Sequence, residues 1–332
     1  MYIFALRVSL LLGIIVVVLG AYTRLSDAGL GCPDWPGCYG RALVPASADQ
    51  IDTTNELYAS RPLEQHKAWK EMTHRYAAGL LGLLILGMTL IAWKNRSKPG
   101  QQLIAPTLLL VLVVLQAMLG MWTVTLLLKP LVVMGHLLGG MSVLALLLWI
   151  SHKERYGTVK HAPASASYFP WAVAGLAIVG LQVSLGGWTS ANYAALICPD
   201  LPVCQGRWWP PMNFTEGFMP WRGLGVNYEY GVLDGQARTA IHVSHRIGAV
   251  ITLFSVGAIA IHAIRAADKH IRRSGVAVLA LLLCQFGLGV GNILFTLPLP
   301  VAVAHNGVAA MLLLSLVTLL FHSRYQAGAN GS

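Results

Sequence analysis

The sequence predicts an all-α membrane protein whose eight transmembrane helices form two parallel-repeat four-helix bundles. Three observations support this fold class: long apolar runs, basic residues sorted between alternate connections, and an internal repeat. The chain has 332 residues, of which 56% are hydrophobic and only 11% are charged. Apolar runs of about 18 residues are long enough to cross a bilayer. Eight such runs occur, at 4–22, 76–93, 103–128, 131–150, 169–188, 247–264, 274–295 and 301–321.

The first run, which contains Arg7, has the length and position of a signal peptide. No small-residue cleavage site precedes the polar loop after it, and seven more spans follow. We therefore expect this run to remain as a transmembrane helix.

Lys and Arg residues are sorted between the connections in a way that indicates orientation. Alternate connections hold eleven Lys or Arg residues and only two acidic ones. These basic segments are 94–98, 152–161, 265–273 and the tail with Arg324. Short basic loops stay in the cytoplasm, so both termini should be cytoplasmic and the loops 23–70 and 190–240 should lie outside. The net charge of +10 therefore reflects topology, and we expect no nucleic-acid partner. The expected location is a bacterial cytoplasmic (inner) membrane, which the chain crosses several times.

Four of the five cysteines form two pairs in the outer loops, within "CPDWPGC" and "CPDLPVC". Outside the cytoplasm such pairs are expected to be disulfides, here Cys32–Cys38 and Cys198–Cys204. Each closes a ring of seven residues, which stabilises the fold by roughly 2 kcal/mol on a chain-entropy estimate. Two interpretations stay open: a rigid staple of the turn, or a redox or gating role for at least one pair.

The two halves of the chain repeat the same landmarks in the same order. "GAYTRLSDAGLGCPDWPGC" from Gly20 matches "GWTSANYAALICPDLPVC" from Gly187, and "EMTHR" at 71–75 matches "HVSHR" at 242–246. Because each half has an even number of spans, the repeats should be parallel, unlike the inverted repeats of many transporters. The predicted units are 1–151, a basic cytoplasmic linker at 152–168, and 169–332.

Four histidines stand out because they lie at similar depth inside the outer face, two in each unit. They are His74, His136, His245 and His305. Any one of them could be a simple hydrogen bond between helices. As a set, two histidines on facing helices can supply both axial ligands of a haem iron. Small residues one turn deeper, such as Gly139 and Gly248, would leave room for a flat macrocycle.

Other histidines and three glutamines carry weaker signals. His152, His161, His270 and His322 lie in or beside basic cytoplasmic segments, where we expect solvated side chains. Gln116, Gln182 and Gln285 each precede a glycine by four residues. Hydrogen bonding between helices is favoured over a role in supporting the histidines.

Arg75 and Arg246 each follow one of these histidines at the outer interface. They could extend to lipid headgroups or hold a haem propionate through two hydrogen bonds. The units differ where Glu71-x-x-His74 in the first becomes His242-x-x-His245 in the second. Residues three apart share a helix face, so Glu71 should lie beside whatever His74 binds. A carboxylate near lipid depth is costly and usually marks function, although Glu71 could be an exposed residue paired with Lys67 or Arg75.

The motifs "EMTHR" and "HVSHR", the histidines of the fourth and eighth spans, the paired cysteine loops and the tandem of eight helices resemble the haem A synthase family. Its members are membrane oxidoreductases that make haem A for cytochrome oxidases. The resemblance implies oxidation of the C8 methyl group of haem O to a formyl group through successive hydroxylations. It also implies that His74 and His136 ligate the substrate haem and that His245 and His305 ligate a bound haem b. Glu71 matches the acidic residue regarded as catalytic, whereas His242 receives no role.

The resemblance further implies partners: a haem O synthase, which is a farnesyltransferase, cytochrome oxidase assembly factors, and an unidentified electron-transfer partner. Membrane lipid is expected around the chain, and a homo-oligomer is compatible with the sequence. Two other functions remain as alternatives: a dihaem b-type electron carrier and a haem transporter or chaperone. A carrier should place its haems toward opposite faces of the membrane, whereas a transporter would not need Glu71.

Overall fold

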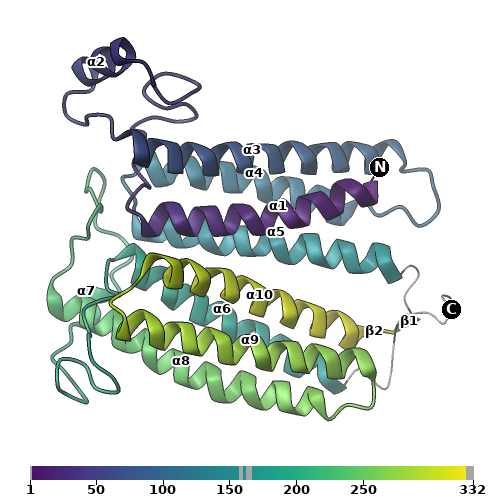
Figure 1. Ribbon diagram of the computed structural model, residues 1–332. Helices are drawn as coiled ribbons and strands as arrows, with labels where there is room; N and C mark the ends of the chain where they lie inside the picture. Colours follow the sequence, from purple (N-terminus) through teal and green to yellow (C-terminus); the bar gives the residue numbers. More distant parts are fainter. Residues whose placement is uncertain (1, 157–159, 162–166, 327–332) are drawn as a thin grey trace.

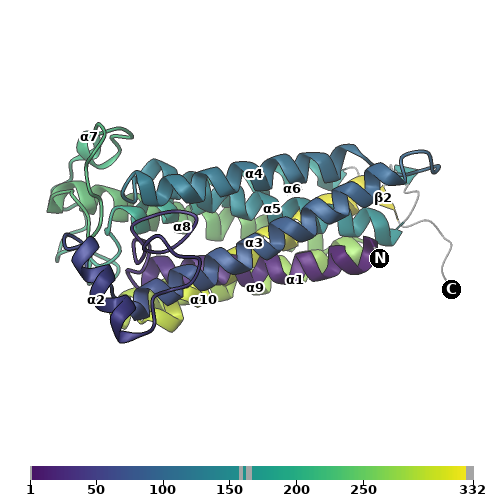
Figure 2. The ribbon, with the colours of Figure 1, turned by 90° about the horizontal axis from the view of Figure 1, so that it is seen from above.

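The computed structural model describes residues 2–156, 160–161 and 167–326. Eight of its helices are long and apolar enough to cross a membrane, as predicted. They are α1 (Tyr2–Leu25), α3 (Gln65–Lys94), α4 (Ile104–Thr125), α5 (Pro130–Tyr156), α6 (Phe169–Ala191), α8 (Gly235–Ile264), α9 (Lys269–Leu294) and α10 (Leu299–Arg324). Figures 1 and 2 show them side by side, with the long loops gathered at one end.

The short elements lie at the two ends of these helices. Helices α2 (Ala48–Leu57) and α7 (Phe214–Gly217) belong to the two long loops. Strands β1 (Lys160–His161) and β2 (Tyr325–Gln326) pair antiparallel at the opposite end. Much of the predicted linker 152–168 lies outside the described residues, and its first part continues α5 to Tyr156.

Local chemistry explains several of the helix ends. The carboxylates of Asp234 and Asp268 accept hydrogen bonds from the first backbone N–H groups of α8 and α9, as N-capping residues do. Proline opens α5 and directly precedes α10, where its missing N–H costs no helical hydrogen bond. The turns before α5 and α10 each contain two successive residues whose backbone adopts the left-handed conformation with positive φ. These residues are Leu127 and Leu128 in the first turn and Thr296 and Leu297 in the second.

Helix contacts divide the eight spans into two groups of four. In the first group α1 packs on α3 and α5, and α4 packs on the same two helices. In the second group α6 and α9 both pack on α8 and α10. The groups meet where α10 contacts α1 and α5 and where α5 contacts α6. Figure 1 shows the first group lying above the second.

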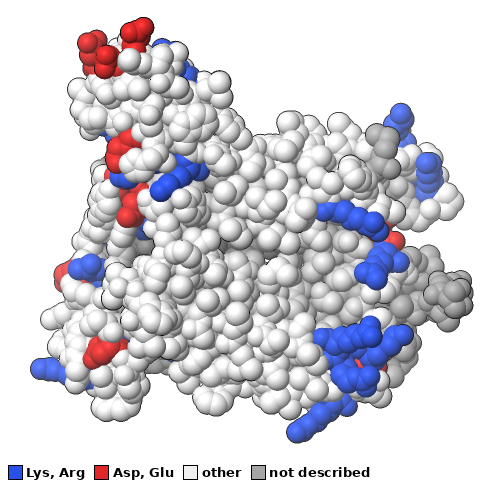
Figure 3. Space-filling model, in the orientation of Figure 1, with Lys and Arg blue, Asp and Glu red and all other residues white. Residues whose placement is uncertain are grey.

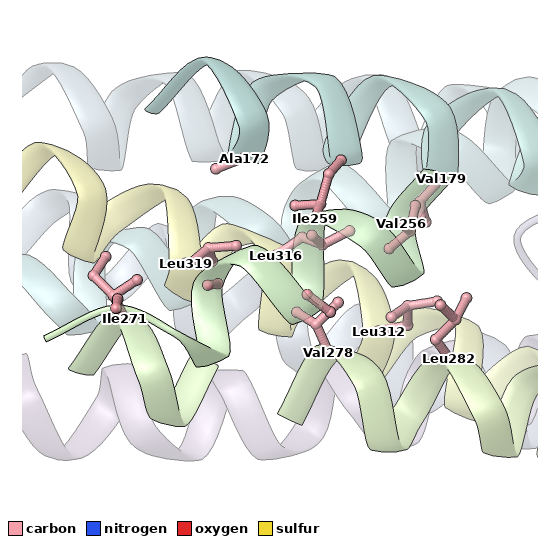
Figure 4. Close-up of a cluster of buried hydrophobic side chains, with 13 residues drawn as sticks. Ala172, Val179, Val256, Ile259, Ile271, Val278, Leu282, Leu312, Leu316 and Leu319 are labelled. Atoms are coloured by element: carbon pink, nitrogen blue, oxygen red, sulfur yellow. The ribbon is translucent and has the colours of Figure 1, made fainter. Parts of the chain in front are cut away.

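Each group has an apolar core in the half of its helices that is distant from the long loops. Leu6, Ile85 and Leu147 are buried in the first group. The second group buries the set that includes Ile271 and Leu316 (Figure 4). The loop-side half of each group, where the four selected histidines lie, holds smaller buried clusters, such as those around Met72 and around Ile241. The two largest apolar cores therefore lie on the side of the histidines that is distant from the long loops.

Charged residues mark the two ends of the helices. In Figure 3 Lys and Arg gather at the end opposite the long loops, whereas both signs occur over the loops. The surface between these ends is almost uncharged in this view. Exposed apolar side chains of the helices include Leu83, Leu90 and Phe254. Such a surface suits contact with lipid tails.

The second long loop crosses onto the first group and ties the two groups together. Glu229 accepts hydrogen bonds from Arg61 at 3.0 and 3.1 Å, and the backbone N–H of Tyr228 donates to Leu127 at 3.0 Å. Lys129 is only 2% exposed and donates to the carbonyl of Gly223 at 2.8 Å, with its ammonium over the ring of Trp221.

Candidate functional site

Glu71 lies in the second turn of α3 and is 4% exposed. One carboxylate oxygen accepts a hydrogen bond from the backbone N–H of Cys32 at 2.8 Å, and the other pairs with Arg75 one turn along the helix. The interpretation of Glu71 as an exposed residue is therefore wrong, although its expected pairing with Arg75 is confirmed. Glu71 links α3 directly to the first cysteine loop.

Both predicted disulfides are present, with Cα–Cα distances of 4.9 Å for Cys32–Cys38 and 4.7 Å for Cys198–Cys204. In each loop the aspartate two residues after the first cysteine accepts two backbone N–H groups beyond the second cysteine. Asp34 accepts from Tyr39 at 2.6 Å and Gly40 at 2.7 Å, and Asp200 accepts from Gln205 and Gly206 at 2.7 Å. The loops are thus two copies of one compact turn.

Each loop is fastened to its helix by an arginine. Arg75 donates to the carbonyl of Asp34 at 2.9 Å and to that of Gly37 at 2.6 Å. Arg246 donates to the carbonyl of Cys198 at 2.6 Å and to two further loop carbonyls at 2.9 Å. These hydrogen bonds use guanidinium N–H groups that would otherwise be free to bind a haem propionate. Propionate binding by either arginine stays a prediction.

His74 on α3 faces His136 on α5 across the first group. Their ring centres are 6.4 Å apart and their planes are nearly perpendicular, at 88°. A metal–imidazole bond is about 2 Å and the nitrogen lies about 1 Å from the ring centre, so two imidazoles on opposite sides of one metal have centres about 6 Å apart. Nδ1 of each ring is buried and has no hydrogen-bond partner among the described residues. The pair fits the two axial positions of a haem iron.

Every one of these histidines rests against a glycine of a neighbouring helix. A Cβ atom added at the glycine would lie 2.9 to 3.3 Å from Cε1 of the ring, which is tighter than nearly all real contacts. The four contacts are Gly20 with His74, Gly120 with His136, Gly186 with His245 and Gly289 with His305. Glycine at these positions lets the ring approach the backbone of the adjacent helix.

His245 on α8 and His305 on α10 occupy the corresponding place in the second group. Gln182 Nε2 is 3.0 Å from Nδ1 of His245, and Gln285 Nε2 is 3.1 Å from Nε2 of His305. Two of the three glutamines, Gln182 and Gln285, therefore form the predicted hydrogen bonds between helices, and these bonds end on the histidines themselves. The space expected over Gly139 and Gly248 is filled by the amides of Gln116 and Gln182.

His242 occupies the position on α8 that corresponds to Glu71 and is likewise 4% exposed. Its Nδ1 is buried and has no hydrogen-bond partner in the described part of the chain. The site therefore carries a carboxylate in one group and an imidazole in the other, in otherwise similar surroundings.

The side chains available in each group favour a haem, which needs at most two protein ligands, over a metal ion bound by the protein alone. Among the described residues no group of three or more His, Cys, Asp or Glu side chains could hold a metal. Structural zinc requires about four such ligands, whereas a haem brings four nitrogens of its own and needs at most two from the protein.

A cavity of about 280 Å³ opens between the two long loops. Its lining includes Gly31, Arg61, Glu64, Glu229 and Tyr230. Gly31 directly precedes Cys32, whose N–H holds the buried carboxylate of Glu71. One residue of the cavity lining is therefore adjacent in sequence to the residue that donates to Glu71.

Two features of these regions were not predicted from the sequence. Three of the four supporting glycines, Gly120, Gly186 and Gly289, were noted only for their spacing from glutamines, and the contact of all four with the histidines depends on how the helices are rotated. The expectation of a solvated His322 is wrong, because it is 7% exposed and its ring centre lies 4.9 Å from His270 and 5.8 Å from His152. The side chain of His161 lies outside the described residues.

Comparison with known proteins identifies the family of this chain. A family model described as cytochrome oxidase assembly protein, COX15-CtaA, matches residues 4–317. A haem A synthase of Shewanella oneidensis is 43% identical over 95% of this chain and 94% of its own length. A haem A synthase of Caulobacter vibrioides is 28% identical over 90% of this chain and 89% of its own length. The chain belongs to the COX15-CtaA family of cytochrome oxidase assembly proteins.

Proposed function

We propose that this protein is a haem A synthase, an oxidoreductase that converts the C8 methyl group of haem O to a formyl group through successive hydroxylations. The observation that carries the proposal is the buried Glu71 one helical turn from His74, at a place where the second group has His242. The similarity to haem A synthases over nearly the whole chain supports it.

His74 and His136 hold the substrate haem in this proposal, and their ring separation of 6.4 Å is the supporting measurement. His245 and His305 hold a resident haem b, whose iron supplies one-electron chemistry when it is bound. Gln182 and Gln285 place amide N–H donors against these two rings.

Glu71 accepts or returns protons beside the reacting edge of the substrate. Both of its partners, the Cys32 N–H and Arg75, are donors, so its oxygens are held as acceptors. That arrangement suits a general base. The cavity beyond Gly31 gives this carboxylate a short route for proton exchange with solvent on the loop side.

The two groups are proposed to be parallel repeats, 1–151 and 169–332, with both termini in the cytoplasm. Matching disulfide loops, aspartate turns, arginine contacts and histidine–glycine contacts support the repeat. The gathering of Lys and Arg at one end supports the orientation (Figure 3). The bacterial relatives favour a cytoplasmic (inner) membrane location.

Membership of an oxidase assembly family supports two kinds of partner. A farnesyltransferase that makes haem O would supply the substrate, and assembly factors of cytochrome oxidase would receive the product. Removal of electrons from the methyl group also requires an electron-transfer partner.

The test is expression in a bacterial host that makes haem O but lacks its own synthase. Haems extracted from its membranes are separated by chromatography and identified by mass spectrometry. Haem A or its hydroxymethyl precursor is the expected result. Haem b with unchanged haem O, in membranes that contain folded protein, would contradict the proposal.

A further inference from the structure

The second long loop carries an apolar segment that its counterpart in the first loop lacks. Both segments follow the Gly-Arg pair that comes directly after a disulfide turn. Residues 208–221 read "WWPPMNFTEGFMPW" and hold five aromatic side chains and one charged residue, whereas residues 42–55 read "ALVPASADQIDTTN" and hold two aspartates and no aromatic residue. We infer that the aromatic segment 208–221 lies in the lipid headgroup region on the loop side, and that the first loop extends into water.

The side chains of the aromatic segment are open to their surroundings instead of filling a core. Trp208 is 77% exposed and Trp209 is 67% exposed. Phe214 opens α7 and Phe218 follows it, and their exposed rings stack with an angle of 9° between their planes. Apolar surface of this kind usually marks a contact with another apolar phase or molecule.

Contacts with two membrane-spanning helices set the depth of α7, which Figure 1 shows beside the loop-side end of α8. Gly217 accepts a hydrogen bond from the indole N–H of Trp188 at 2.8 Å, and it packs on Ala237 and Ile241 in the first two turns of α8. Trp188 ends the apolar run of α6, and the apolar run of α8 begins after Ile241, at residue 247. Helix α7 therefore lies just outside the apolar runs. A headgroup layer about 5 to 8 Å thick adjoins the hydrocarbon core at this level.

The surroundings of the aromatic segment favour lipid over a protein partner. Side chains at 247, 250 and 251 of α8 are apolar and exposed, so the segment adjoins helix surface that is suited to lipid tails. Its one carboxylate, Glu216, pairs with Arg222, which directly follows the segment. Tryptophan prefers the membrane interface because its ring is apolar while its N–H needs a polar partner. An aromatic surface without unpaired charge, at this depth, fits the headgroup region.

This contact has a consequence for the junction between the two groups. The chain that follows the aromatic segment crosses to the first group, where Gly223 accepts from Lys129 and Glu229 pairs with Arg61. Lipid contact at 208–221 therefore anchors one end of the stretch that ties the groups together. The anchor depends on the membrane alone and would form with or without bound haem.

Spin-label accessibility in the full-length protein tests the inference. Nitroxide labels are attached at Trp209→Cys and Phe214→Cys, with Leu57→Cys as the matched control, because Leu57 at the end of α2 is 76% exposed. Each variant also carries Cys284→Ser, which removes the free cysteine and keeps both disulfides. The proteins are reconstituted in vesicles of phosphatidylethanolamine and phosphatidylglycerol. Relaxation by oxygen, which concentrates in lipid, is compared with relaxation by a water-soluble nickel chelate.

The ratio of oxygen to nickel relaxation should be higher at positions 209 and 214 than at position 57. Equal ratios at all three positions would place the aromatic segment in water and overturn the inference. Protection of 209 and 214 from both reagents would show that protein covers them, either a second copy or another partner, and would also overturn it.

Tryptophan quenching by lipids brominated near the headgroup end of their chains provides a second measurement that needs no new cysteine. Replacing both indoles, by Trp208→Phe with Trp209→Phe, should lower the quenched share of the total fluorescence, because two lipid-contacting fluorophores are removed. An unchanged or higher share would mean that these two indoles lie away from lipid, which contradicts the inference and leaves the proposed function intact.

Discussion

The regions around Glu71 and His242 are built on the same plan and differ in one kind of side chain. In both, a compact disulfide loop is fastened to the helix by the arginine four residues later, Arg75 or Arg246. In the first region Arg75 also pairs with Glu71, which in turn holds the N–H of Cys32. In the second region the described hydrogen bonds of Arg246 all go to backbone carbonyls, and the buried Nδ1 of His242 has no hydrogen-bond partner among the described residues.

The comparison separates scaffold from chemistry. Features common to both groups, such as the loop turns and the glycine contacts, position two histidines at one depth and do not explain a reaction. Features of one group alone are candidates for reactivity, and at this position the first group has the carboxylate of Glu71 where the second has the imidazole of His242. The two groups therefore provide an internal control for each other, because a change can be made at corresponding positions.

The largest expected effect comes from removing a ligand. His74→Ala or His136→Ala should abolish binding of haem O in the first group and leave the haem b spectrum of the second. His245→Ala or His305→Ala should do the reverse, since each iron loses one of its two protein ligands. Haem content and reduced-minus-oxidised spectra of purified protein measure both effects. Loss of both haems in every variant would contradict the assignment of separate sites.

A smaller effect is expected at the supporting glycines. Gly20→Ala and Gly186→Ala place a Cβ 2.9 and 3.1 Å from the histidine rings, which forces a shift of the ring or the helix. Overpacking of this kind costs about 1 to 3 kcal/mol of stability, and the unfolding temperature of the haem-loaded protein should fall. Gly180→Ala is the matched control, because nothing lies within 4 Å of its added Cβ. Equal unfolding temperatures for Gly186→Ala and Gly180→Ala would refute the glycine contact.

The sequence predicted the eight spans, the disulfides and the facing pair of His74 and His136 because each leaves a local signal: hydropathy, cysteine spacing, or a histidine near a span end. The contacts of Gly20 and Gly186 leave no such signal, since glycine is common at membrane helix interfaces. Their contacts depend on helix rotation. The crossing of the second loop onto Leu127 and Arg61 also lay beyond prediction, because it depends on how the two groups are placed together.

The smallest expected effect concerns pH at the second loop. Backbone N–H groups of Gly206 and Gln205 donate to Asp200 and hold its pKa below its ordinary value of 3.8. The carboxylate therefore stabilises the folded loop fully above its ordinary pKa, and that contribution is lost as pH falls through the lower folded pKa. Acidification from pH 5 to pH 3 should speed reduction of Cys198–Cys204 by a phosphine about twofold, as suits an exposed interaction. Asp200→Asn should remove this dependence, and an unchanged pH profile in that variant would contradict it.

The central claim, that chemistry belongs to the first group and retention to the second, is tested most directly by a matched pair of substitutions. Glu71→Gln and His242→Gln place the same neutral side chain at corresponding positions, and haem A is measured in membranes of the haem O-producing host. Glu71→Gln should lower haem A by about a hundredfold, the lower range of what a general base contributes, with haem O still bound. His242→Gln should keep haem A within about twofold of wild type, since this position performs no proton transfer in the account. Equal losses in the two variants, or haem A formation unaffected by Glu71→Gln, would contradict the claim.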